Sequence, residues 1–177
     1  MKMMMFARKP LGRWVLSACL LGSSWQGMAE PLAAGQQAPT FQATTLDGRT
    51  FDLQDYRGNK PVYLKFWATW CSYCKAEMPH LDAIAQQYGD AIEILTVNIG
   101  LNDSKANIQQ FYQQHGYQLP TVFDQQGELT RKYQVVGTPY HVLIDKQGKI
   151  AYQTFLATDQ LDALVTSWGQ TAAETAH

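Results

Sequence analysis

Two cysteines three positions apart, Cys71 and Cys74, are the residues of this 177-residue chain whose types and spacing most directly indicate chemistry. They follow an apolar run at residues 62–68 and precede a stretch with helical spacing of apolar residues, so they lie at a predicted strand-to-helix junction. The first N–H groups of a helix lack intrahelical partners and carry positive partial charge, which favours a thiolate at the first cysteine. We therefore expect Cys71 to be the nucleophile of a thiol–disulfide exchange and Cys74 to be the resolving thiol.

The N-terminal segment predicts export from the cytoplasm. Its charged residues are all basic, an uncharged stretch follows at 14–29, and the first acidic residue is Glu30. Such a basic start, followed by an uncharged stretch that ends in small residues, is typical of a secretory signal peptide. We predict a signal peptide at residues 1–29, cleavage after Ala29, and a periplasmic or other extracytoplasmic location.

A lipid anchor is the alternative interpretation of the same segment. The sequence Leu-Ser-Ala-Cys that ends at Cys19 is similar to a lipobox, in which this cysteine would be lipidated and would tether the protein to a membrane. Only residues 14–18 separate it from Arg13, whereas an h-region has roughly 7–15 apolar residues, so cleavage after Ala29 is favoured. An uncleaved anchor fits less well, because a spanning helix needs about 20 predominantly apolar residues.

Removal of the leader changes the charge of the chain. The whole chain has 14 basic and 15 acidic residues, and four basic residues lie in the leader, which leaves 10 basic against 15 acidic residues and a net charge of −5. This excess of negative charge disfavours nucleic acid as a partner. The two remaining cysteines are too close in sequence to stabilise a fold by loop closure, so we expect their pairing to serve chemistry.

Alternating strand and helix patterns predict a mixed α/β sheet around the cysteine pair. An Asp-Gly turn at 47–48 predicts an N-terminal β-hairpin, and the apolar run 62–68 predicts a central strand covered on both faces. A helix is expected from Cys71 to Tyr88, bent at Pro79. The other expected features are a strand at 92–99, a helix capped by Asn102 or Asp103 and closed by Gly116, a strand at 121–123, a short helix at 129–133, a hairpin of 141–144 and 150–155, a last helix ending near Trp168, and a flexible tail at 171–177 behind a domain that spans 30–170.

From about Gln36 to Trp168 the chain resembles the TlpA/ResA-type thiol-disulfide oxidoreductases of the thioredoxin superfamily, with a redoxin or AhpC/TSA-like domain. The matches are the Phe-Trp-Ala-Thr-Trp-Cys approach at 66–71, the C-x-x-C itself, Pro79 five residues after the second cysteine, and Thr138-Pro139 ahead of an apolar strand. The resemblance implies a thioredoxin-like α/β fold with an N-terminal β-hairpin and a central helix–strand insertion, here at 102–123.

The same resemblance implies roles for residues around the dithiol. Pro139 is expected to be cis and to lie against the disulfide, which leaves the backbone of Thr138 free to pair with an extended substrate. Glu77, one helical turn after Cys74, is expected to tune thiol ionisation and to transfer protons; the alternative is a solvated carboxylate that matches the helix dipole. Trp70 is expected to offer an apolar docking surface beside the nucleophile.

Lys65 departs from thioredoxin, which has a buried acid six residues before the first cysteine. A strand lysine at this position either pairs with Glu77 or points outward. The proton route of thioredoxin therefore cannot be carried over to this chain. Glu77 is the substitute candidate, and water is the alternative.

The expected activity is that of an exported thiol-disulfide oxidoreductase. The resemblance favours a reductase of protein disulfides, of the type that serves cytochrome c maturation or copper-site assembly, recharged by a membrane electron donor. No cofactor is expected beyond the redox-active Cys71–Cys74 disulfide. The residues themselves leave the direction open, because this class spans reduction potentials of about −270 to −120 mV.

Two other classes of function remain as alternatives. C-x-x-C is half of a zinc motif, so a metal-binding module would need His80, His115 or His141 as further ligands, and Cu(I), which binds thiolates, is the better candidate. A thiol peroxidase is the second alternative, because residues 36–66 resemble the entry to peroxiredoxins. Those proteins have a proline four residues before a Thr-x-x-Cys, and residues 65–70 contain none.

Overall fold

The computed structural model of the chain describes residues 32–175, and their strands and helices confirm the mixed α/β class. The elements in chain order are β1 (Gln42–Thr44), β2 (Thr50–Asp52), the 3-10 helix η1 (Leu53–Tyr56), β3 (Val62–Trp67), α1 (Ser72–Tyr88), β4 (Glu93–Asn98), α2 (Lys105–His115), β5 (Thr121–Phe123), α3 (Glu128–Lys132), β6 (Tyr140–Ile144), β7 (Ile150–Thr154) and α4 (Asp159–Thr175). The expected signal peptide at 1–29 and the alternative lipobox at Cys19 lie outside the described residues. Among the helices that are described, none is both long and apolar enough to cross a bilayer.

A five-stranded mixed sheet with the order β5-β4-β3-β6-β7 forms the frame of the described domain. β3 is parallel to β4 and antiparallel to β6, and β7 is antiparallel to β6. Because of these directions, β3 and β4 end, β6 begins and β7 ends at the same end of the sheet, which we call the cysteine end. Every residue of β3 is buried, as a central strand covered on both faces requires.

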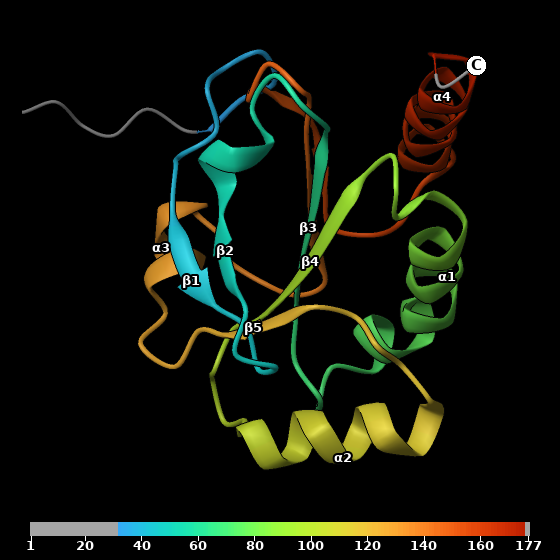
Figure 1. Cartoon of the computed structure of the whole chain (residues 1–177). Coiled ribbons are helices and arrows are strands. Elements are labelled where there is room, and N and C mark those ends of the chain that lie inside the picture. The colour runs from blue at the N-terminus through green and yellow to red at the C-terminus, as the bar shows by residue number, and fades with distance from the viewer. Residues whose placement is uncertain (1–31, 176–177) are drawn as a thin grey trace, which may run out of the picture. The chain divides into compact units, whose positions relative to one another are not determined.

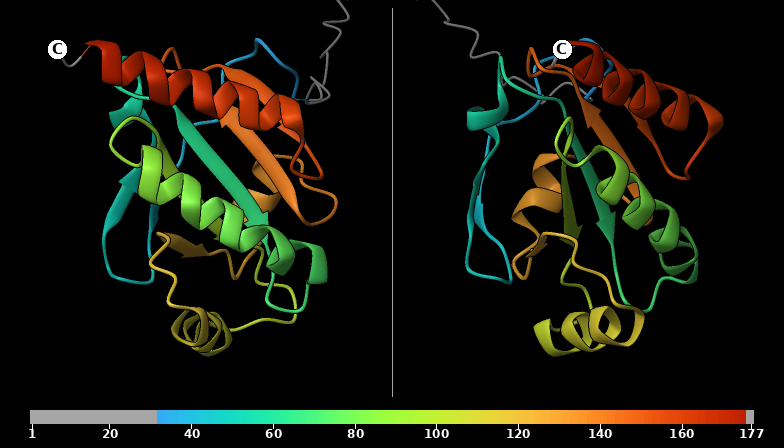
Figure 2. Two further views of the ribbon diagram at one scale, coloured as in Figure 1. Left: turned by 90° about the vertical axis from the view of Figure 1, so that its right-hand side faces the viewer. Right: turned by 45° about the vertical axis from the view of Figure 1, so that its right-hand side comes forward.

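Apolar clusters fill the space on both faces of the sheet. On one face α1 and α4 pack across the strands, around a cluster that includes Met78, Leu81 and Leu161 (Figure 2). On the other face lie the β1–β2 hairpin and α3, over a cluster that includes Phe51 and Leu129 (Figure 1). Full burial of such a side chain stabilises the fold by about 1.5–3 kcal/mol. The C-x-x-C therefore lies where β3 leads into α1, and apolar packing holds both of these elements in place.

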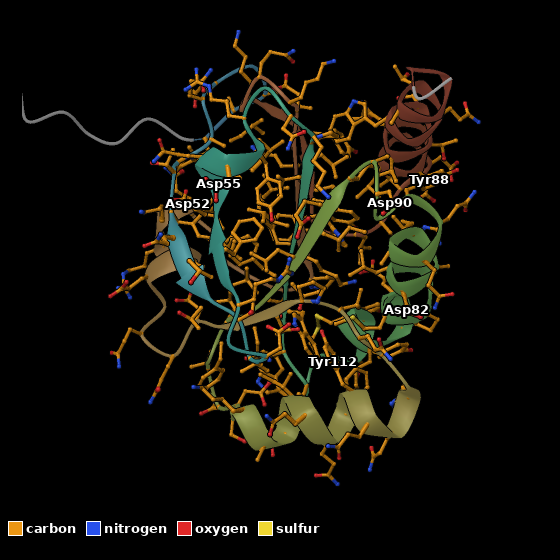
Figure 3. The ribbon with its side chains drawn as sticks, in the orientation of Figure 1. Asp52, Asp55, Asp82, Tyr88, Asp90 and Tyr112 are labelled. Carbon is orange, nitrogen blue, oxygen red and sulfur yellow. A yellow bond between two sulfur atoms is a disulfide. The ribbon has the colours of Figure 1, made fainter. Side chains whose placement is uncertain are left out.

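The last helix differs from the sequence-based expectation. We expected it to end near Trp168 and residues 171–177 to be flexible, but α4 continues to Thr175. Gly169 lies within this longer helix, and a Cβ at this position would clash with the ring of Tyr88, which lies beside α4 at the end of α1 (Figure 3). The missing side chain lets the two helices approach each other, and the helix continues beyond it.

The start of α2 also differs from the expectation. Neither Asn102 nor Asp103 caps this helix; the Oγ of Ser104 accepts the N–H of Asn107 at 3.1 Å instead. The other end is as predicted, because Gly116 closes the helix in the left-handed conformation with φ 73°. Asp103 is thereby free to bond to the segment that leads into the cysteines.

Candidate active site

Cys71 and Cys74 form a disulfide at the N-terminus of α1. Cys71 is the N-cap residue, and its Sγ accepts the N–H of Cys74 at 3.1 Å. The first turn of the helix, residues 72–75, contains no acidic side chain that would offset the positive partial charge of the helix end. The helix therefore favours negative charge at the sulfur of Cys71.

The two cysteines differ in exposure to solvent. Cys71 keeps 6% of its surface exposed, whereas Cys74 is 0% exposed beneath it. A partner thiol or disulfide therefore reaches Cys71 first. This asymmetry fits an attacking thiol at Cys71 and a resolving thiol at Cys74.

Glu77, one turn after Cys74 on α1, joins the active-site helix to the sheet. Its Oε2 accepts hydrogen bonds from the Nζ of Lys65 at 2.7 Å and from the Nε2 of His141 at 3.1 Å. Its Oε1 accepts the N–H of Ala157 at 2.9 Å. Lys65 and His141 are register partners on β3 and β6, and the side chain of Lys65 is fully buried. Of the two options for Lys65, pairing with Glu77 is the one observed.

The hydrogen-bond directions around His141 follow from its partners. A carboxylate only accepts hydrogen bonds, so the Nε2 of His141 donates to Glu77. Burial lowers the pKa of His141, which keeps the ring neutral, and its Nδ1 then accepts the O–H of Tyr63 at 2.7 Å. A buried chain of hydrogen bonds thus runs from Tyr63 through His141 to Glu77, beside the cysteine helix.

Glu77 keeps its negative charge in this chain. Burial alone would raise the pKa of Glu77, but the hydrogen bonds from His141, the Ala157 N–H and Lys65 lower it to about 2. A carboxylate with this pKa is a weak base at neutral pH. Glu77 therefore stays ionised at neutral pH and keeps accepting hydrogen bonds from the same partners. This disfavours the proton transfer that was expected of it from the sequence.

Large apolar side chains that are exposed gather at the cysteine end of the sheet. They come from the segments after β3, β4 and β7, from the first turn of α1 and from the segment before β6. Among residues 32–172 they are Trp70, Tyr73, Leu101, Val136, Phe155 and Leu156, which we call the apolar face. The Thr138–Pro139 peptide bond, which is cis, lies in the segment that carries Val136. Exposed apolar side chains that form one patch are typical of an interaction site, whereas single ones are common on any surface.

Asp103 is a positioning residue that the sequence did not reveal. Its carboxylate accepts the N–H of Thr69 at 2.7 Å and the O–H of the same residue at 2.8 Å, two positions before the first cysteine. It also accepts the Nδ2 of Asn98 at 2.7 Å and the N–H of Ser104 at 2.9 Å. From the sequence, Asp103 was considered only as a cap of α2, and Ser104 takes that place.

Replacing Asp103 with asparagine should lower the free energy of unfolding by about 1.5–3 kcal/mol. Asparagine has the same shape, but its NH₂ group would face donors, so at least one of the four hydrogen bonds is lost. Urea unfolding of the oxidised protein measures the change. Asp90→Asn, at an exposed position after α1, is the matched control and should stay within about 0.5 kcal/mol of the wild type. Equal stability of the two variants would contradict the role of Asp103.

The histidines considered as further metal ligands lie on three different elements. His80 on α1 bonds to Asp162 at 2.8 Å, and the Nδ1 of His115 on α2 lies 2.9 Å from the backbone oxygen of Phe111. His141 on β6 belongs to the chain with Glu77. Within residues 32–175, no group of three or more histidine, cysteine or acidic residues is placed to hold a metal ion.

Comparison with known proteins gives consistent similarities. The model of the AhpC/TSA family matches residues 34–153. The thiol-disulfide oxidoreductase ResA of Geobacillus thermodenitrificans is 41% identical over 120 residues, which is 67% of this chain and 67% of that protein. The solved structure of the exposed lipoprotein thioredoxin Etrx1 of Streptococcus pneumoniae is 36% identical, with a TM-score of 0.63 over 75% of this chain and 99% of its own.

A second solved structure leads to the same fold. It is that of a secreted Mycobacterium tuberculosis disulfide oxidoreductase homologous to E. coli DsbE, which is 27% identical, with a TM-score of 0.62 over 72% of this chain and 95% of its own. These likenesses confirm the thioredoxin-like fold expected from the sequence.

Proposed function

Because this chain belongs to the AhpC/TSA family and is a thiol-disulfide oxidoreductase of the ResA type, we propose that it reduces protein disulfides outside the cytoplasm. The observation that carries the proposal is the placement of Cys71, which is the more exposed of the two cysteines, lies at a helix N-terminus and shares its end of the sheet with the apolar face. A polypeptide with a disulfide offers both the sulfur and the apolar side chains that such a surface can bind.

The reaction proceeds in two exchanges. The thiolate of Cys71 attacks one sulfur of the substrate disulfide, the substrate S–S bond breaks, and the departing thiolate takes up a proton. Cys74, once deprotonated, then attacks the sulfur of Cys71 and releases the second substrate thiol. Two electrons pass from the dithiol to the substrate, and the protein is left with the Cys71–Cys74 disulfide that the structure holds. The disulfide itself is the redox centre, so the reaction needs no added cofactor.

The substrate lies across the segment before β6 in this proposal. Thr138 offers its backbone to an extended chain, and Pro139 and Trp70 provide apolar contact. Support comes from the topology, since these residues and Cys71 belong to segments at the cysteine end of the sheet. With Glu77 as a fixed charge, the departing thiolate and water accept the protons that the dithiol loses.

Export and recharging complete the proposal. The predicted signal peptide at 1–29 sends the protein out of the cytoplasm, or the lipobox at Cys19 tethers it to a membrane, and relatives described as exposed or secreted support such a location. Outside the cytoplasm the dithiol is recharged by a membrane electron donor. Cytochrome c maturation and copper-site assembly are the processes that need such a reductase.

The reduction potential of the Cys71–Cys74 pair tests the direction. Strong oxidants of this class owe their potential to a stabilised reduced form. Here Lys65 and Glu77 are neutral as a pair, so they add no net positive charge to what the helix N-terminus gives the Cys71 thiolate. We expect the protein, equilibrated in thiol–disulfide buffers, to show a potential nearer to about −270 than to about −120 mV. A value at the oxidising end would overturn the assignment as a reductase.

A further inference from the structure

The loop between β7 and α4 presents apolar side chains beside the proposed substrate-binding turn. Phe155 and Leu156 are 50% and 47% exposed. The ring of Phe155 meets that of Tyr140 edge-on at 5.1 Å, and a Cβ on Gly137 would lie 3.7 Å from it. This loop therefore borders the segment that contains Thr138. Its position decides how much apolar contact a bound polypeptide can make.

Glu77 ties this loop to the active-site helix. Its Oε1 accepts the N–H of Ala157, the residue directly after the exposed pair, at 2.9 Å. Its Oε2 is held by Lys65 and His141, on two strands that are paired in register. The strands thus fix the plane of the carboxylate and aim its other oxygen at the loop. Oε2 thus bonds to the sheet and Oε1 bonds to the loop.

We propose that Glu77 is a positioning residue that anchors the Phe155–Leu156 loop to the cysteine helix and so favours polypeptide disulfides over small ones. A polypeptide substrate contacts side chains beyond the reacting sulfur, whereas a small disulfide only needs to reach the sulfur of Cys71. The inference rests on the proposed function, because it concerns the surface that receives the substrate.

Two double variants separate the anchor from the charge. Both carry Lys65→Met, which removes the buried cation that would otherwise lose its partner. In Lys65→Met/Glu77→Gln, the amide oxygen still accepts the N–H of Ala157. The amide NH₂ donates to the Nε2 of His141, whose ring then carries its proton on Nδ1 and donates it to the hydroxyl oxygen of Tyr63. In Lys65→Met/Glu77→Met, a side chain of similar size offers no such acceptor. The variants therefore have the same charge, and they differ in the acceptor for the Ala157 N–H and in the partner of His141.

The readout is a ratio of two rate constants. We compare reduction of a disulfide-bonded peptide that has apolar residues on both sides of its cysteines with reduction of 2-hydroxyethyl disulfide. The ratio should stay within about twofold of the wild type in the glutamine variant and should fall about tenfold in the methionine variant, as expected for a lost hydrogen bond that positions a binding loop. Glu128→Gln, at an exposed position on α3, is the control for the whole procedure and should leave both rates unchanged.

The results that would contradict the anchor differ from the result that would contradict the proposed function. If Glu77 acted on the thiols through its charge, the two double variants would shift the pH profile of Cys71 alkylation alike and would show equal ratios, which would overturn the anchor. Ala157→Pro removes the donor without touching either charge, and it should lower the ratio as well; an unchanged ratio in this variant contradicts the proposal even if the methionine variant does not fold. A wild-type protein that reduces 2-hydroxyethyl disulfide but not the peptide would instead overturn the proposed function.

Discussion

Cys71→Ser should abolish disulfide reduction, with a fall in rate of about a thousandfold or more, because a serine hydroxyl stays protonated where the thiol ionises. Cys74→Ser should behave differently, because it leaves the attacking sulfur in place and removes only the second exchange. In that variant the first exchange should proceed once and stop at a covalent adduct between Cys71 and the substrate.

Non-reducing mass spectrometry of each variant, reduced and then mixed with a disulfide-bonded peptide, measures this difference. The Cys74→Ser protein should give an adduct that dithiothreitol releases, and the Cys71→Ser protein should give none. The two variants control each other, because the substitution is the same and only the position differs. An adduct on Cys74 in the Cys71→Ser protein would reverse the assignment, and the complete burial of Cys74 makes this outcome the less expected one.

The sequence predicted most of the frame that holds these sulfurs, because its signals there are local. A continuous apolar run marked β3, and the Asp-Gly turn marked the β1–β2 hairpin. Gly116 marked the end of α2, where a left-handed residue is required. The end of the last helix was predicted too early, near Trp168, because Gly169 serves a close approach to Tyr88 and lies inside α4. A glycine needed for packing between helices cannot be told from a stop by local pattern.

The candidate site was predictable only in part. The cysteine pair was evident from its spacing, and Thr138-Pro139 was singled out by the resemblance. For Lys65 the sequence left two options, since a strand position does not say what its side chain meets. The bond from the Ala157 N–H to Glu77 joins residues 80 positions apart and involves a backbone group, which carries no residue-type signal at all. Long-range contacts of this kind become visible only when the packing of the sheet and the helices is known.

Glu77→Gln should destabilise the protein by about 3–5 kcal/mol at neutral pH, since it leaves the fully buried Lys65 cation without its carboxylate. Lys65→Met should cost less, because Glu77 would still accept from His141 and Ala157 and keeps 16% of its side chain exposed. The double variant Lys65→Met/Glu77→Gln should recover most of the loss, since an uncharged pair of similar size needs no ionic partner. Urea unfolding of the oxidised proteins measures all three, with Glu128→Gln as the matched control.

The pH dependence identifies the charge as the cause. The pKa of Glu77 is lowered from its ordinary value of 4.5 to about 2 in the folded protein, so its ionised form contributes stability above pH 4.5 and loses that contribution as the pH falls toward 2. This contribution is of the order of 3 kcal/mol. The difference between wild type and Glu77→Gln should therefore be constant above about pH 5 and should narrow below it, since the protonated glutamate resembles glutamine. A difference that stays the same from pH 7 to pH 3 would mean that shape, and not the Lys65–Glu77 charge pair, accounts for the loss.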